Sequence, residues 1–184
     1  MNVCRGFFMK KTAIIMLILS VLLLFSSCKG EPQRFFDYQD SLKYVCGKYS
    51  ENDREYSLEM YFTENEKGDV YCRRVEYTAP DSIKGLTFTL EGKNITAELC
   101  GVRIADSYFE KEEVFRMSAL FALSEEDIYD IKAGKDGTCQ VFGKNGDAVW
   151  QVTTDKKGLP VEIAYENGEG KYSFSVEKIK LNTE

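Results

Sequence analysis

The sequence predicts a mainly β domain of the α+β class, built on an antiparallel sheet with one helical interruption. Apolar and polar residues alternate in several segments, short polar turns separate those segments, and one segment has the spacing of a helix instead. With 184 residues, of which 43% are hydrophobic and 29% charged, the chain has the composition of one ordinary globular domain.

Strands with one buried face are predicted where every second residue is apolar. The alternation is clearest in residues 56–63, 86–90, 95–99 and 159–166. The turns between these segments are short, so successive strands should pair as antiparallel neighbours.

A β-hairpin is predicted around Asn145-Gly146, a dipeptide that suits a two-residue turn. If these two residues are the turn, Val141 lies opposite Trp150. The apolar residues of both strands then share one face of the sheet, so the turn and the pattern agree.

The last strand is predicted to contain a β-bulge. Tyr172, Phe174 and Val176 share one parity, whereas Ile179 and Leu181 have the other. Both halves can face the core only if one extra residue is inserted near residue 177.

A helix is predicted over residues 110–123, because its apolar residues recur at intervals of three and four. These residues are Val114, Met117, Leu120 and Phe121. After it, residues 124–127 suit a capped second helix with Ile128 and Ile131 one turn apart, or alternatively the approach to a strand at Tyr129.

The N-terminal residues 1–27 are predicted to be a secretion signal. Lys10 and Lys11 precede an apolar run over 13–25, which is too short to span a bilayer as a permanent helix. Translation could begin at Met1 or at Met9, which directly precedes the two lysines.

Cys28 is the predicted lipidation site. The stretch 24–28, Leu-Phe-Ser-Ser-Cys, resembles the lipobox of bacterial lipoproteins, in which the cysteine receives a diacylglyceryl group and becomes the first residue. We therefore expect a lipidated tether at 28–37, a domain at 38–184, and a lipid-anchored protein on the extracytoplasmic side of the cell membrane.

Charge and composition exclude several classes of function. The chain contains no histidine, which excludes Ser-His-Asp and Cys-His catalysis and histidine-ligated zinc. Without residues 1–27 it would carry 21 basic and 30 acidic residues, so we expect no nucleic-acid partner. The acidic cluster Glu125, Glu126, Asp127 and Asp130 lacks calcium-loop spacing, and we expect neither metal nor cofactor.

Four further cysteines have no predictable pairing. Cys46, Cys72, Cys100 and Cys139 permit two disulfides in an oxidising compartment, or four buried thiols. The sequence leaves their disulfide state open.

The order of elements, together with residues 79–93, resembles the lipoprotein-carrier superfamily typified by LolA and LolB. The resemblance covers residues 41–181. It implies a curved antiparallel sheet that forms an incomplete, half-open barrel, with one or two helices on its concave side. In that superfamily the apolar hollow receives acyl chains or a partner protein, and no site residue can be transferred by position.

Three functions follow as hypotheses. The first is binding of a hydrophobic ligand, a lipid or the acyl chain of another lipoprotein, by Phe115, Met117, Leu120 and Phe121, although a helical apolar stripe is more often simply core. The second is a non-enzymatic envelope adaptor that binds a partner protein through its sheet surface or edge. A third is a hydrolase that uses carboxylates alone, for which the sequence offers no positive signal.

Overall fold

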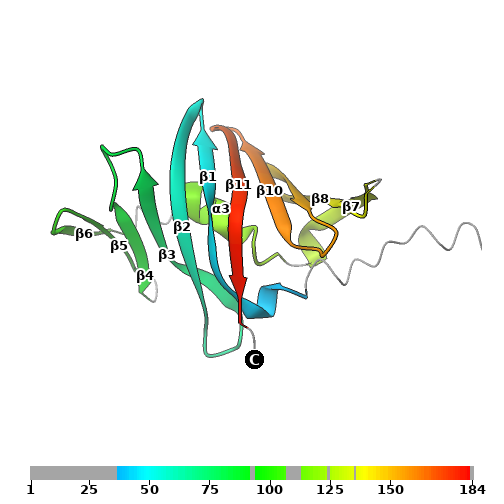
Figure 1. Ribbon diagram of the computed structural model, residues 1–184, viewed down its shortest axis with the longest axis horizontal. Helices are drawn as coiled ribbons and strands as arrows, with labels where there is room; N and C mark the ends of the chain where they lie inside the picture. Colours follow the sequence, from blue (N-terminus) through cyan, green and yellow to red (C-terminus); the bar gives the residue numbers. More distant parts are fainter. Residues whose placement is uncertain (1–36, 92–93, 107–112, 124, 135, 183–184) are drawn as a thin grey trace, which may run out of the picture. The chain divides into compact units, whose positions relative to one another are not determined.

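The computed structural model describes residues 37–91, 94–106, 113–123, 125–134 and 136–182. The predicted signal peptide, Cys28 and most of the predicted tether lie outside these residues. In the described part, a single antiparallel sheet of 11 strands is accompanied by one short α-helix (Figure 1). Among the described residues, no helix has the length and apolar character needed to cross a bilayer.

The strands follow one another along the chain with one helical segment in the middle. They are β1 (Leu42–Glu51), β2 (Arg54–Glu64), β3 (Val70–Ala79), β4 (Thr87–Glu91), β5 (Asn94–Leu99), β6 (Val102–Asp106), β7 (Ile128–Ala133), β8 (Cys139–Asn145), β9 (Ala148–Thr154), β10 (Pro160–Asn167) and β11 (Gly170–Leu181). The helical elements are η1 (Gln39–Ser41), α3 (Glu113–Ala119) and η3 (Glu125–Asp127).

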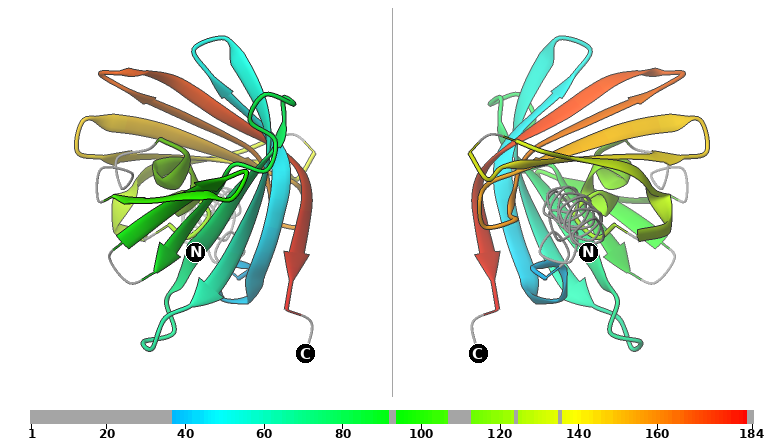
Figure 2. Two further views of the ribbon diagram at one scale, coloured as in Figure 1. Left: turned by 90° about the vertical axis from the view of Figure 1, so that its left-hand side faces the viewer. Right: turned by 90° about the vertical axis from the view of Figure 1, so that its right-hand side faces the viewer.

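The sheet is open, because its two outermost strands do not pair with each other. The strand order is β6-β5-β4-β3-β2-β1-β11-β10-β9-β8-β7, so β6 and β7 form its edges. Figure 2 shows the sheet arching over α3, which lies on its concave side. The predicted fold class, a curved antiparallel sheet that is not closed into a barrel, is confirmed.

β-Bulges occur along the strands wherever inward-facing residues are three positions apart. The bulge predicted near residue 177 is present, since Gly47 pairs with Val176 and Cys46 with Lys178. The same arrangement recurs in four other strands. The bulged residues Lys43, Arg73, Tyr129, Val161 and Glu177 are exposed, and a further bulged residue, Thr78 of β3, is half-buried. Bulges increase the local twist and bend of a strand, so they favour the curvature of this sheet.

The core fills the space between α3 and the concave face of the central strands. Its fully buried side chains include Val45 and Tyr49 of β1, Met60 of β2 and Phe174 of β11. Phe121, just after α3, packs edge-to-face against Phe62 and Phe174, with ring centroids 5.8 Å apart in both pairs. Aromatic pairs of this geometry add to the stabilisation from buried area.

Helix α3 is shorter than the predicted helix. Residues 110–112 lie outside the described part, and the helix ends at Ala119. After Ala119 the backbone hydrogen bonds join residues that are three positions apart, as in a 3-10 helix. Leu120 N donates to Met117 O at 3.1 Å, and Phe121 N donates to Ser118 O at 3.2 Å. Tight turns of this kind are frequent where an α-helix ends.

The predicted second helix at 124–131 is wrong. Residues Glu125–Asp127 form one 3-10 turn, and the alternative interpretation, a strand, begins at Ile128. Ile128 and Ile131 pair with Gly143 and Val141. The bulge at Tyr129 turns both isoleucines to one face, so their three-residue spacing comes from a bulged strand and not from a helical turn.

The hairpin of β8 and β9 is confirmed, but its register differs by two residues from the prediction. Asn145 pairs with Ala148, so Gly146 and Asp147 form the turn, and Trp150 faces Gly143 rather than Val141. A shift of two keeps every side chain on its predicted face. Gly146 takes the positive φ of 63° at the first turn position.

Candidate functional site

A cavity of about 400 Å³ lies between the α3–β7 segment and the concave face of β8, β9 and β10. Ligand pockets in proteins typically enclose about 300–1,000 Å³. The residues that line it are Arg116, Ala119, Leu120, Ala122, Leu123, Asp127, Asn145, Asp147, Ala148, Trp150 and Tyr165.

The cavity has an apolar floor and a polar rim. The floor consists of buried Leu120, Leu123, Ala148, Trp150 and Tyr165. The rim carries more accessible side chains, among them Arg116, Asp127, Asn145 and Asp147. An apolar interior with a few polar groups at the opening suits an amphiphile whose apolar part is buried and whose polar end stays near water.

Trp150 occupies its place in the floor because residue 143 has no side chain. Gly143 lies directly opposite Trp150 in the β8–β9 pair, and a Cβ atom added there would collide with the Cζ2, Cε2 and Cη2 atoms of the indole. The indole therefore lies flat across β8. Since Trp150 is the single tryptophan of the chain, its fluorescence reports on the surroundings of this one indole, which include the cavity floor.

Arg116 connects the rim to the floor. Its Nη1 atom donates a long hydrogen bond of 3.5 Å to Tyr165 Oη, which also accepts from Asn167 Nδ2 at 3.0 Å. Arg116 belongs to α3 and Tyr165 to β10, so this contact crosses the cavity from helix to sheet. A guanidinium at the opening is the group best suited to an anionic head group.

The helix side of the cavity is held by residues at the start of the domain. Tyr38 Oη donates to Phe121 O at 3.2 Å, and burial raises the pKa of this phenol. With its amide oriented to suit both partners, Gln39 donates to Leu123 O and accepts from Leu123 N, each at 3.2 Å. The chain that leads in from residue 37 is thus fastened to a wall of the cavity.

The four residues predicted to bind ligand fall in different environments. Leu120 lines the cavity, whereas Met117 and Phe121 are fully buried in the core. Phe115 is half-buried and packs edge-to-face against Phe88, 6.1 Å between centroids. Helical periodicity therefore located one lining residue. Trp150 and Tyr165 were not singled out, because their pattern is that of ordinary inward-facing strand residues.

The described cysteines are all free thiols. Cys72 is buried beneath the sheet, where desolvation raises its pKa to about 12. Its Sγ donates to Arg74 O at 3.5 Å. Cys100 is exposed in the turn between β5 and β6, and Cys46 and Cys139 are half-buried.

The acidic residues at 125–130 lie in η3 and at the start of β7. In the described part of the chain, no group of three or more acidic or cysteine side chains is placed to hold an ion. Asp127 lies on the rim of the cavity, and Asp130 pairs with Lys132 at 3.4 Å.

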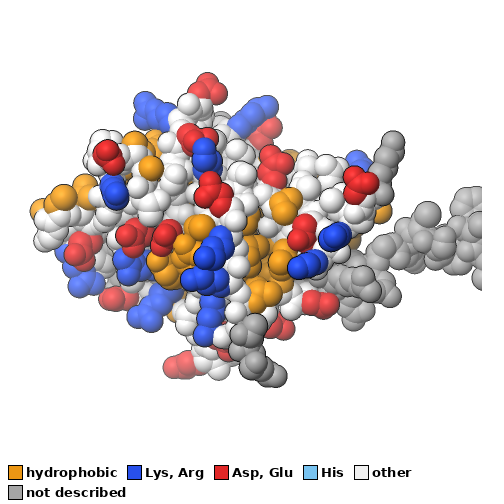
Figure 3. All heavy atoms as spheres, viewed as in Figure 1, with side chains coloured by type: hydrophobic (Ala, Val, Ile, Leu, Met, Phe, Trp, Pro, Cys, Tyr) orange, Lys and Arg blue, Asp and Glu red, His pale blue; other side chains and the backbone are white. Residues whose placement is uncertain are grey.

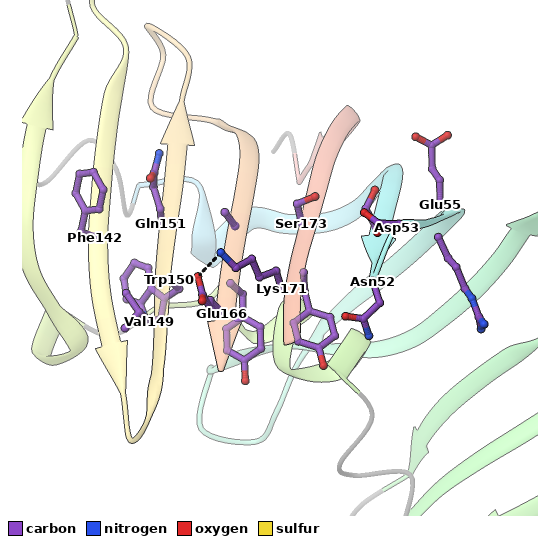
Figure 4. A pocket seen from close by; sticks show the side chains of 15 residues that line it. Asn52, Asp53, Glu55, Phe142, Val149, Trp150, Gln151, Glu166, Lys171 and Ser173 are labelled. Carbon is purple, nitrogen blue, oxygen red and sulfur yellow. Dashed lines mark ion pairs between the residues drawn. The ribbon is translucent and has the colours of Figure 1, made fainter. Parts of the chain in front are cut away.

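A second depression, of about 700 Å³, lies where the hairpins of β1–β2, β8–β9 and β10–β11 come together (Figure 4). Ser173, Ala164, Gln151 and Phe142 are neighbours across four strands and contribute small or half-buried side chains. Charged side chains surround them, including Lys171 paired with Glu166 at 3.4 Å. This depression is more open to solvent than the cavity beside α3.

No protein-family model matches the chain, and no curated protein sequence matches it significantly. Three solved structures illustrate the similarity of fold. An uncharacterized conserved protein from Thermus thermophilus has 13% identity and a TM-score of 0.48, over 83% of this chain and 88% of that one. The lipoprotein LppX from Mycobacterium tuberculosis has 12% identity and a TM-score of 0.42, over 84% and 99%.

The third is a LolA superfamily protein from Nitrosomonas europaea, with 14% identity and a TM-score of 0.43, over 83% of this chain and 94% of that one. A member of the superfamily that the sequence resembles is thus found among the structural neighbours. At such identities the likeness is confined to the fold.

Proposed function

We propose that this chain is a membrane-anchored extracytoplasmic lipoprotein that binds a hydrophobic ligand, either a lipid or the acyl chain of another lipoprotein. In this proposal residues 1–27 are a signal peptide, Cys28 carries the lipid, 28–37 are a tether and 38–184 the binding domain. The cavity beside α3 is the binding site. The observation that supports this most directly is its apolar floor of buried Leu120, Leu123 and Trp150 below an accessible rim.

Burial of apolar surface supplies the driving force for such binding. Each methylene group transferred from water contributes about 0.8 kcal/mol, so an acyl chain can bind without any strong polar contact. The same arithmetic explains why two acyl chains on Cys28 would anchor the protein stably, whereas one chain would anchor it only marginally.

Ligand uptake is tested by the fluorescence of Trp150. A brominated fatty acid that enters the cavity should quench this indole in the Cys28→Ala protein, and native mass spectrometry should detect the complex. An unquenched indole, with no complex by mass spectrometry, would contradict the binding function.

A blocking variant sharpens the test. Ala119 lines the cavity from the exposed side of α3, so Ala119→Phe should obstruct the site without disturbing the core. We expect at least a tenfold loss of affinity for the fatty acid. The matched control is Ala105→Phe on β6, which is also exposed and does not line the cavity, and it should bind as the unaltered chain does.

Anchoring is tested separately. Cys28→Ala should release the protein from membranes, and mass spectrometry of the unaltered protein should show the added acyl mass. Membrane retention of the variant, with no acyl mass on the parent protein, would contradict lipidation.

An adaptor function is the second candidate, and the edge strand β6 favours it. Val102 and Ile104 are 63% and 55% exposed, on a strand that has no further strand beside its outer edge among the described residues. Unprotected edges of this kind can accept a strand from another protein. Ile104→Lys should then abolish capture of an envelope partner, whereas ligand uptake measured by Trp150 should not change.

A further inference from the structure

Aromatic and basic side chains form a row across the outer face of β3, β2, β1 and β11. Tyr44 pairs with Tyr61 on one side and with Lys180 on the other, and Tyr61 pairs in turn with Arg74. The two tyrosine rings meet edge-on, with centroids 5.3 Å apart. Lys180 lies over the ring of Tyr44 at 4.8 Å and Arg74 over that of Tyr61 at 5.5 Å.

Two more lysines extend this row, and we call the set of six the basic-aromatic patch: Lys43, Tyr44, Tyr61, Arg74, Lys178 and Lys180. Lys43 is exposed at a bulge beside Tyr44, and Lys178 is exposed opposite Cys46. Figure 3 shows Lys and Arg side chains gathered beside hydrophobic atoms over the lower half of β1 and β11.

Two carboxylates near the patch have partners within it, and a third, the exposed Glu177, directly precedes Lys178 in β11. Glu59 accepts a hydrogen bond from Tyr61 Oη at 2.5 Å, which raises the pKa of that phenol to about 12. Glu76 pairs with Arg74 at 2.7 Å. The four basic side chains Lys43, Arg74, Lys178 and Lys180 outnumber these three carboxylates, so the patch keeps a local positive charge, although the whole chain carries a net charge of −6.

The patch lies at the end of the sheet where the predicted tether joins the domain. Asn182 N donates to Ser41 O at 2.6 Å, and Leu42 pairs with Leu181, so the start of β1 and the end of β11 lie together. Tyr44 follows Tyr38 by only six residues. Nine residues separate Cys28 from Tyr38, and such a segment reaches about 35 Å at full extension.

We propose that the basic-aromatic patch lies against the membrane that anchors Cys28, where its lysines contact the head groups of anionic phospholipids. Lysines near an anionic membrane surface are attracted to it, and tyrosines are enriched at the depth of the head groups. The short tether keeps the patch close to that surface. This inference rests on the proposed anchoring.

The test measures the reactivity of lysines in the full-length lipidated protein on vesicles. An amine-acylating reagent is applied with vesicles of phosphatidylcholine alone or of phosphatidylcholine with phosphatidylglycerol, and peptides are compared by mass spectrometry. Lys43, Lys178 and Lys180 should react at least threefold less on the anionic vesicles. Lys144 and Lys171 are matched controls, since both are exposed near the hairpins at the opposite end of the sheet, and they should react equally on both.

Salt and a charge reversal provide two further conditions. High salt shortens the screening length from about 10 Å at 0.1 M to about 3 Å at 1 M, so it should abolish the protection. The double variant Lys178→Glu with Lys180→Glu should leave Lys43 equally reactive on both vesicles, whereas Lys144→Glu with Lys171→Glu should keep Lys43 protected.

The outcomes separate the two proposals. Protein that floats with the vesicles but shows equal reactivity of the patch lysines on both would overturn the membrane contact and leave the anchoring intact. Protein that does not float with the vesicles would overturn the anchoring, and the membrane contact with it. Protection at Lys144 and Lys171 instead would overturn the assigned orientation.

Discussion

Helix α3 meets the sheet differently on its two sides. Toward β2, β3 and β11 it is packed without space, because Met117 and the following Phe121 are fully buried there. Toward β8, β9 and β10 it stands off, and the cavity occupies the gap. The same short helix thus stabilises the fold with one face and borders a cavity with the other. The predictions below test whether these two roles are separable.

The largest effect is expected on the packed side. Phe121→Ala removes a ring held between Phe62 and Phe174, so we expect a loss of about 3–5 kcal/mol in the free energy of unfolding, measured with urea. Leu120→Ala should cost less, about 2 kcal/mol, because its side chain already borders a cavity. Equal losses in the two variants would contradict the comparison.

The next effect is expected in the cavity floor. Gly143→Ala places a methyl group where the indole of Trp150 lies, so the ring must move, at a cost of about 1–3 kcal/mol. The emission maximum of Trp150 should shift, and fatty-acid binding should weaken. Gly168→Ala is the control, since an added Cβ there has no neighbour within 4 Å and should change neither property. An unshifted emission maximum in Gly143→Ala would refute this account of the floor.

A smaller effect depends on pH and belongs to the packed side again. Burial raises the pKa of Cys72 from 9.0 to about 12, so above pH 9 the unfolded chain loses this proton while the folded chain keeps it. The contribution of the Cys72 thiol to the free energy of unfolding is therefore fully present below pH 9. It falls as the pH rises toward 12, by up to about 1.4 kcal/mol per pH unit. When the free energy of unfolding is measured with urea at several pH values between 9 and 12, it should fall less steeply with pH in Cys72→Ala than in the unaltered chain. The exposed Cys100→Ala should show the same fall of stability with pH as the unaltered chain. The same fall in Cys72→Ala would count against this explanation.

The smallest effect on stability is expected at the rim. Arg116→Ala removes an exposed side chain and a hydrogen bond of 3.5 Å, so the free energy of unfolding should change by less than about 0.5 kcal/mol. Its affinity for a fatty acid should fall about threefold, and its affinity for the corresponding fatty alcohol should not change. Equal losses for both ligands would show that Arg116 does not contact the head group.

The sequence predicted the strands well because alternation is a local property of the chain. It left residues 128–131 open between a helix and a strand, because a bulged strand and a helical turn both bring residues three apart to one face. The bulge at Glu177 was predictable, since the parity of the apolar residues changes within an otherwise continuous strand.

The cavity itself could not be predicted from the sequence. It depends on how far α3 stands from β8–β10, which is a matter of packing between segments distant in the chain. Leu120 was found through its helical spacing. Trp150 was missed, and the missing signal was the register, because only the pairing of Gly143 with Trp150 explains why the indole lies across β8.

Among the described strands, β6 and β7 are unpaired edges, and if the arch binds a ligand as proposed, these edges affect the range of ligands that it accepts. A closed barrel has its radius fixed by strand number and stagger, whereas an open sheet changes its span through small rotations between adjacent strands that preserve every interstrand hydrogen bond. The two flanks can therefore spread or draw together as the enclosed molecule varies in bulk. Such a scaffold accommodates a series of related guests more readily than one of fixed diameter.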